Sequence, residues 1–124
     1  MSNIFTKPRG TQDMLYDKAR SYNKIVDILN SVATNYGASP QIPMYEESRL
    51  FKRGVGNSTD IVMKETFDLA NKGDHDYSLR PEFTAGIMRA IIENKLYASP
   101  DLPLKLYYSG SIFRYERPQQ GRYR

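Results

Sequence analysis

The sequence has no cysteine, no apolar signal-peptide centre at its start and no long apolar run. Without cysteine, a disulfide framework and a thiolate metal site are both excluded, and a reducing cytoplasm is the expected compartment. No stretch approaches the roughly 20 apolar residues that span a bilayer. The 124 residues allow one domain at most. We therefore expect a cytoplasmic protein that does not bind a membrane.

The glycine-rich loops that bind phosphates in common nucleotide-binding folds are also missing. Gly54 and Gly56 stand without the third glycine and the preceding strand of a dinucleotide fingerprint, and no Gly-Lys-Ser or Gly-Lys-Thr triplet occurs. A nucleotide would have to be bound by another device.

Positive charge is present, and it is concentrated near the end of the sequence. The formal net charge is +4 and the pI is about 9.3, which allows an anionic partner. Residues 114–124 hold four arginines against one glutamate. This concentration favours a phosphate ligand at that segment over a general affinity for polyanions.

A long amphipathic helix is the clearest structural signal. Apolar residues recur at alternating spacings of four and three, which predicts a helix over residues 17–36. Asp17 is the expected cap of this helix, and Gly37 is its expected left-handed terminator. The apolar stripe consists of Leu15, Ala19, Tyr22, Val26, Leu29, Ala33 and Tyr36.

The rest of the chain predicts mixed helices and strands. Residues 66–69 and 76–79 flank a polar stretch and predict a β-hairpin. Because strands and crossover helices do not alternate regularly, the expected class is α+β, an antiparallel sheet with flanking helices. Residues 40–46 are expected to be an extended sheet-edge or interface segment, followed by a short helix from Ser48 that Gly54 and Gly56 break and by a helical turn within 57–64. His75 is expected to be solvated. A helix after Pro81 that carries Leu96 and is closed by Pro100 and Pro103, and a strand pair that begins at 104–108, complete the expectations.

The first candidate site follows the second hairpin strand. Pro81 fixes the chain there, and Glu82 and Thr84 stand at the start of a helix. A carboxylate and a hydroxyl at that place suit the α-amino group of an amino acid, because both accept hydrogen bonds from an ammonium group. The alternative is that Glu82 only caps the helix. The spacing leaves both interpretations open.

The second candidate site is the segment of residues 107–124. An apolar strand there leads into Arg114 and Glu116, which alternation places on one strand face, and then into a basic loop with a glycine. A rigid arginine suits a phosphate, and a carboxylate two residues later suits a donor such as the adenine amino group. A structural ion pair between the two side chains, or a strand tip with solvated arginines, is the alternative.

The two segments together resemble a histidyl-tRNA synthetase, which is a class II aminoacyl-tRNA synthetase. Arg-Pro-Glu-Phe-Thr at residues 80–84 and Phe-Arg-Tyr-Glu-Arg-Pro-Gln-Gln-Gly-Arg-Tyr-Arg at residues 113–124 are the most specific matches. The opening residues 8–13 and Pro-Met-Tyr-Glu at residues 43–46 match as well. The resemblance implies that residues 1–124 form the N-terminal part of a class II catalytic domain, with motif 1 at about 17–47 and the first strand and loop of motif 2 at about 107–124.

The resemblance also implies a reaction and roles for residues. ATP activates histidine to histidyl adenylate, and the histidyl group passes to the 3′ end of tRNA(His), with Mg²⁺ on the phosphates. Arg114 would be catalytic, bridging the histidine carboxylate and the α-phosphate. Phe83 would line the histidine pocket. The other implied roles are Glu82 and Thr84 for the α-amino group, Glu116 for adenine, Arg122 and Tyr123 for ATP, Gln119, Gln120 and Arg124 for the motif 2 loop and tRNA, and Pro43 for a homodimer interface.

Some expectations concern departures from the family pattern. Phe83 stands where many bacterial members have glycine, which would reshape the pocket wall, and Tyr16 replaces a proline. Because the sequence ends within motif 2, we expect the imidazole-binding residues, the metal ligands and the anticodon-binding domain to be absent. On that ground the chain alone is expected not to form histidyl adenylate. Without the returning motif 2 strand, residues 113–117 would be a sheet edge with unpaired amides that self-associates.

Two other functions remain open at the level of sequence. One is a non-catalytic regulatory or dimerisation module, akin to the synthetase-like subunit of histidine biosynthesis. The Arg-Pro-Gln-x-Gly-Arg loop argues against it, because that loop serves ATP and tRNA. The other is a general basic RNA-binding module, which predicts steep salt dependence and no response to ATP.

Overall fold

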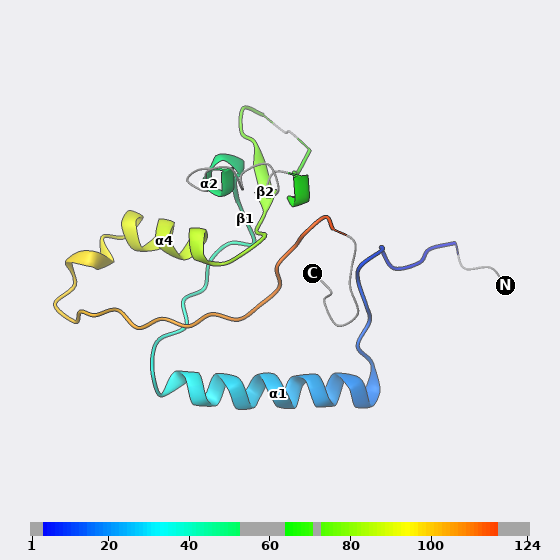
Figure 1. Ribbon diagram of the computed structural model, residues 1–124, viewed down its shortest axis with the longest axis horizontal. Helices are drawn as coiled ribbons and strands as arrows, with labels where there is room; N and C mark the ends of the chain where they lie inside the picture. The colour runs from blue at the N-terminus through cyan, green and yellow to red at the C-terminus, as the bar shows by residue number, and fades with distance from the viewer. Residues whose placement is uncertain (1–3, 53–63, 71–72, 117–124) are drawn as a thin grey trace.

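The structure is a computed structural model, and it describes residues 4–52, 64–70 and 73–116. Figure 1 shows a long helix lying apart from a small sheet with its own helices, and an extended segment running between the two. The predicted α+β class is confirmed. The elements are α1 (Tyr16–Thr34), β1 (Tyr45–Glu47), α2 (Ser48–Lys52), β2 (Tyr77–Leu79), α4 (Thr84–Glu93) and the short 3-10 helix η2 (Leu96–Ala98).

Helix α1 confirms the long helix predicted from the apolar stripe. Its start differs from the expectation, because Leu15 is the residue at the N-cap and no side chain caps the helix there. Asp17 lies in the first turn and pairs with Arg20, with 3.5 Å between the carboxylate and the guanidinium. Both side chains are at least 80% exposed, so this pair contributes little stability.

Gly37 follows α1, but its backbone is not left-handed, so its predicted role as a left-handed terminator is wrong. Instead, the missing side chain of Gly37 lets the backbone of Lys105 come close. A Cβ at this position would lie 2.4 Å from the carbonyl oxygen of Lys105. The next residue, Ala38, donates its amide to that same carbonyl and accepts from the amide of Tyr107. Glycine therefore lets the end of α1 join the extended segment.

The sheet of the described residues consists of β1 and β2, paired antiparallel with Glu46 opposite Ser78. The predicted hairpin is confirmed, because residues 67–69 pair with the other side of β2. Leu69 donates to the Tyr77 carbonyl and Leu79 donates to the Phe67 carbonyl, each at 2.9 Å. Ser78 is fully buried and its hydroxyl bonds both Ser48 and Asp68. The short helix from Ser48 is confirmed as α2, whereas Gly54, Gly56 and most of the predicted turn at 57–64 lie outside the described residues.

Helix α4 packs on the sheet through an arginine. Arg89 donates from Nη2 to Glu46 of β1 at 2.9 Å and from Nη1 to Glu93 at 2.6 Å. Its Nε lies 2.8 Å from the Glu46 carboxylate as an ion pair without hydrogen-bond geometry. The hydrogen bond with Glu46 raises the pKa of the Arg89 guanidinium. The helix ends at Glu93, ahead of the prolines predicted to close it, because Lys95 takes a left-handed conformation and Leu96 starts η2.

We predict that Arg89→Met destabilises the chain by about 1–3 kcal/mol, since Glu46 is only 9% exposed and would lose its cation. Arg20→Met is the matched control, with an expected cost under about 0.5 kcal/mol. Thermal unfolding followed by circular dichroism measures both. Equal effects of the two substitutions would show that the Glu46 pair does not join α4 to the sheet.

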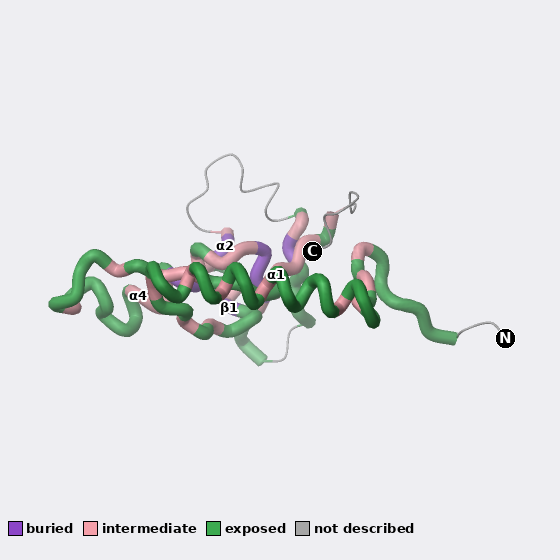
Figure 2. The backbone as a smooth tube through the Cα atoms, turned by 90° about the horizontal axis from the view of Figure 1, so that it is seen from below, coloured by how far each residue is buried: buried purple, intermediate pink, exposed green. Residues whose placement is uncertain are grey.

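The described part of the chain has a very small apolar core. Phe51 and Ile87 form its buried core, at 4% and 6% exposure, and Pro81 is buried as well. The chain exposes 10462 Å², against about 6,800 Å² for a compact protein of its mass. Figure 2 shows α1 exposed along nearly its whole length. The apolar side chains exposed on α1 include Tyr22, Ile25, Ile28, Leu29 and Val32.

The predicted strand pair that begins at 104–108 forms no regular strand among the described residues. Leu106 makes one parallel bridge with Ala38, and the chain then continues in extended form. Two backbone amides beyond it are bonded: Phe113 donates to the Arg80 carbonyl at 2.9 Å and Tyr115 to the Glu65 carbonyl at 2.6 Å. The prediction of unpaired amides is therefore wrong for these two residues.

Candidate functional site

The site is formed by the turn at residues 80–84 and the extended segment at residues 108–116. Arg114 connects them, because its Nε donates to the Pro81 carbonyl at 3.1 Å. The arginine is half-buried. Phe113 supports the same contact through its backbone bond to Arg80. The two candidate segments from the sequence thus lie side by side.

Glu82 caps helix α4. Its two carboxylate oxygens accept from the backbone amide of Ala85 at 3.1 and 3.2 Å. The capping role that the sequence left open is thereby present. Each carboxylate oxygen has a second lone pair, so the cap leaves capacity for an ammonium donor.

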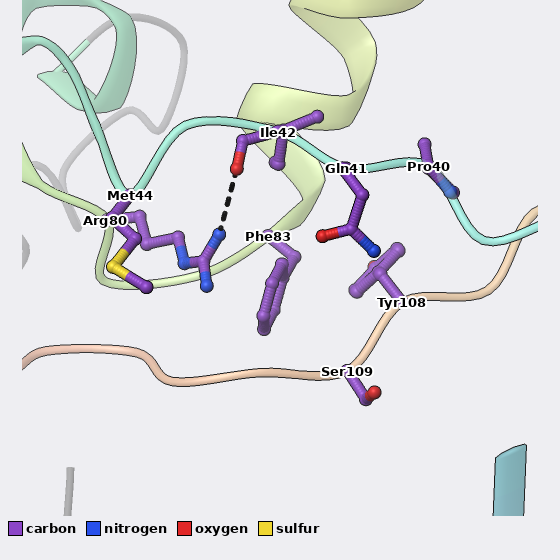
Figure 3. A pocket seen from close by; sticks show the side chains of 8 residues that line it. All are labelled: Pro40, Gln41, Ile42, Met44, Arg80, Phe83, Tyr108 and Ser109. Atoms are coloured by element: carbon purple, nitrogen blue, oxygen red, sulfur yellow. Dashed lines mark hydrogen bonds between the residues drawn. The ribbon is translucent and has the colours of Figure 1, made fainter.

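Thr84 and Phe83 both contact Tyr108. The Thr84 hydroxyl lies 3.2 Å from the Tyr108 hydroxyl, and the Phe83 ring lies against the Tyr108 ring with centroids 4.8 Å apart. The Arg80 guanidinium sits 4.4 Å from the centre of the Phe83 ring. Arg80, Phe83 and Tyr108 line a pocket of about 80 Å³ together with Gln41 and Ser109. Figure 3 shows these five side chains around it. Phe83 thus lines this pocket, and its place in a histidine pocket stays a prediction.

The other predicted site residues are placed as follows. Glu116 is half-buried, two residues beyond Arg114 in the extended segment. Pro43 is exposed, beside Met44 and Tyr45, which are also more than half exposed. His75 is exposed, as predicted, and its ring stacks on Tyr77 at 5.8 Å. Gln119, Gln120, Arg122, Tyr123 and Arg124 lie outside the described residues.

The sequence-based prediction missed Arg80 and Tyr108. Arg80 is 7% exposed, and burial lowers the pKa of its guanidinium from the ordinary value. A charged residue at the inner end of an apolar strand was the available signal for Arg80. Tyr108 had no signal of its own, since its role depends on contacts with residues 24 and 25 positions earlier.

Two kinds of feature are absent from the described residues. Over 4–52, 64–70 and 73–116, three or more His, Cys, Asp or Glu side chains nowhere converge as metal ligands would. No helix in those ranges has the length and apolarity needed to cross a membrane.

Comparison with known proteins identifies the family. Residues 66–124 match the model of the tRNA synthetase class II core domain (G, H, P, S and T). The histidine–tRNA ligase of Mycoplasma mycoides subsp. mycoides is 49% identical over 122 residues, which cover 98% of this chain and 30% of that ligase. The chain belongs to the histidyl-tRNA synthetase family. It spans about 30% of the length of the curated relatives that it matches.

Solved structures agree with this family. The apo histidyl-tRNA synthetase of S. aureus superposes with a TM-score of 0.75 at 35% identity, covering 92% of this chain and 30% of that one. A Bacillus halodurans protein described as an ATP phosphoribosyltransferase regulatory subunit/histidyl-tRNA synthetase superposes with a TM-score of 0.72 at 23% identity, covering 95% of this chain and 30% of that one. The second match shows a shared fold alone.

Proposed function

We propose that this chain provides part of the histidine and ATP site of a histidine–tRNA ligase. The observation that carries the proposal is the bond from Arg114 to the Pro81 carbonyl. This bond keeps Arg114, the predicted phosphate-binding residue, beside Glu82 and Thr84, which are predicted to bind the α-amino group. An amino acid bound there would present its carboxylate toward Arg114 while its ammonium group faces Glu82.

The proposed chemistry is the transfer of an adenylyl group. A carboxylate oxygen of histidine attacks the α-phosphorus of ATP, the bond to the bridging oxygen breaks, and pyrophosphate leaves. Arg114 stabilises the negative charge that grows on the α-phosphate oxygens in the transition state. Its guanidinium is already oriented by Pro81, so little reorganisation is needed. The histidyl group is then transferred to the 3′ end of tRNA(His).

The remaining roles rest on the family relationship. Glu116 would contact adenine, and the loop of residues 117–124 would reach the outer phosphates through Arg122 and Tyr123, and the tRNA acceptor end. The exposed Pro43 would belong to a homodimer interface formed with motif 1 at about 17–47. Cytoplasmic translation is the proposed setting. Mg²⁺ would accompany ATP on its phosphates, and the described residues offer no cluster of ligands that would hold it.

A chimera tests this proposal directly. The 124 residues replace the matching segment of the Mycoplasma mycoides histidine–tRNA ligase, in a fusion called here the ligase chimera. We expect histidine-dependent exchange of pyrophosphate into ATP, because the chain would contribute a working half of the site. A folded chimera without exchange, tested beside the intact relative, would contradict the proposal.

A regulatory module remains the second candidate, and the Bacillus halodurans fold match is the observation in its favour. It predicts that the chain binds histidine without ATP and assembles with a phosphoribosyltransferase. Calorimetry with histidine alone, followed by addition of that enzyme, separates the two functions. Exchange activity in the ligase chimera favours the synthetase.

A further inference from the structure

Arg80 is the buried charged residue for which neither the sequence nor the proposed mechanism has a role. It stands at the end of β2, directly before Pro81, and it is 7% exposed. In the described residues no carboxylate forms an ion pair with it, so its charge is not explained by a salt bridge. A guanidinium keeps its charge even when buried, so its burial costs free energy that its hydrogen bonds must offset.

The contacts of Arg80 join three separate chain segments. Its Nε donates to the Ser111 carbonyl at 2.8 Å, and its Nη1 points to the Ile42 carbonyl at 3.4 Å. Its backbone amide donates to Met44, and its carbonyl accepts from Phe113, both at 2.9 Å. Figure 3 shows the side chain reaching across from the turn at 80–84 toward Ile42 and Phe83.

The extended segment also comes unusually close to Arg80. A Cβ added at Gly110 would lie 3.0 Å from Nη2 of Arg80 and 3.2 Å from the Phe83 ring. Glycine there lets the guanidinium and the Phe83 ring both lie close to the backbone at residue 110. Since lysine has neither a planar group nor a fork of donors, it cannot fill this position in the same way.

Arg80 and Arg114 brace the same two segments in opposite directions. Arg80 donates to the carbonyl of Ser111, three residues before Arg114, and Arg114 donates to the carbonyl of Pro81, one residue after Arg80. The backbone bond from Phe113 to Arg80 lies between them. Releasing one arginine should therefore loosen the support of the other.

We propose that Arg80 is a positioning residue that fixes Arg114 over the Pro81–Glu82 turn and ties this contact to the segment at residues 42–44. The effect on reaction rests on the proposed function, whereas the effect on the position of Arg114 does not. Segment 42–44 contains Pro43, and Arg80 reaches it twice, through its guanidinium at the Ile42 carbonyl and through its backbone amide at the Met44 carbonyl.

Amide hydrogen exchange of the full chain, read by NMR, tests the positioning role without any ligand. Arg80→Lys keeps the charge but loses the Nε bond to Ser111. We expect the Phe113 amide to exchange at least about tenfold faster and the Arg114 Nε–H signal to shift toward that of a free arginine, with the β1–β2 amides unchanged. Arg20→Lys on α1 is the matched control and should change neither signal.

Three results would overturn the proposal: a Phe113 amide that is unprotected in the unmodified chain, an Arg80→Lys variant that behaves like Arg20→Lys, or a loss of protection that spreads equally over β1 and β2. The ligase chimera adds a kinetic test. There Arg80→Lys should lower kcat for pyrophosphate exchange about tenfold while KM for histidine stays within about twofold. If the unmodified chimera is inactive, the proposed function fails, and amide exchange still decides the role of Arg80.

Discussion

Replacing Arg114 with alanine in the ligase chimera should lower kcat for pyrophosphate exchange by about 10²- to 10³-fold. The reason is that Arg114 would contact charge that develops only in the transition state, so its loss changes kcat more than KM. Its present geometry supports this expectation, because the bond to the Pro81 carbonyl uses Nε, and within the described residues no hydrogen bond occupies the terminal nitrogens.

Arg114→Lys separates charge from geometry. Lysine keeps the positive charge but cannot donate to Pro81 and bind a phosphate oxygen through one planar group. We expect at least about a tenfold loss of kcat for this variant as well. Arg49→Ala, on α2, is the control and should leave exchange unchanged, since Arg49 is 85% exposed and pairs only with the neighbouring Glu47 among the described residues. Full activity of Arg114→Ala would exclude a role in the transition state.

Pairing between distant segments was predicted only where each of the two segments carries its own recognisable sequence pattern. The hairpin between 66–69 and 76–79 follows from a polar stretch that separates two apolar ones, and the structure confirms it. The contact of Gly37 with Lys105 has no local mark, because a glycine after a helix also suits a left-handed terminator. What distinguishes the two roles is a segment far along the chain.

In the candidate site, too, only residues with a local sequence pattern were predicted. Arg114 and Glu82 were found from residue type and spacing, and the structure brings their segments together. Their own partners, the Pro81 carbonyl and the Ala85 amide, are backbone groups that no side-chain pattern reveals. Arg80 was missed for the same reason, since its partners are the carbonyls of Ser111 and Ile42. Buried arginines that bind backbone leave little trace in the sequence.

Glu82 offers the sharpest test of the site, because its carboxylate now has two assigned tasks. It caps α4 through the Ala85 amide, and it would bind the α-amino group of histidine. Glu82→Gln keeps an acceptor oxygen for the cap but removes the negative charge. In the ligase chimera we therefore expect KM for histidine to rise about 10- to 150-fold, from the loss of a charge-assisted bond, with kcat less affected.

The stability of the same variants separates clamp from cap. Glu82→Gln should leave the free energy of unfolding within about 0.5 kcal/mol of the unmodified chain, whereas Glu82→Ala loses the cap and should cost about 1 kcal/mol. If Glu82 were only a cap, Glu82→Gln would bind histidine normally and Glu82→Ala would weaken binding in proportion to its loss of stability. A large rise in KM for Glu82→Gln at unchanged stability can come only from the missing charge, because the cap acceptor is still in place.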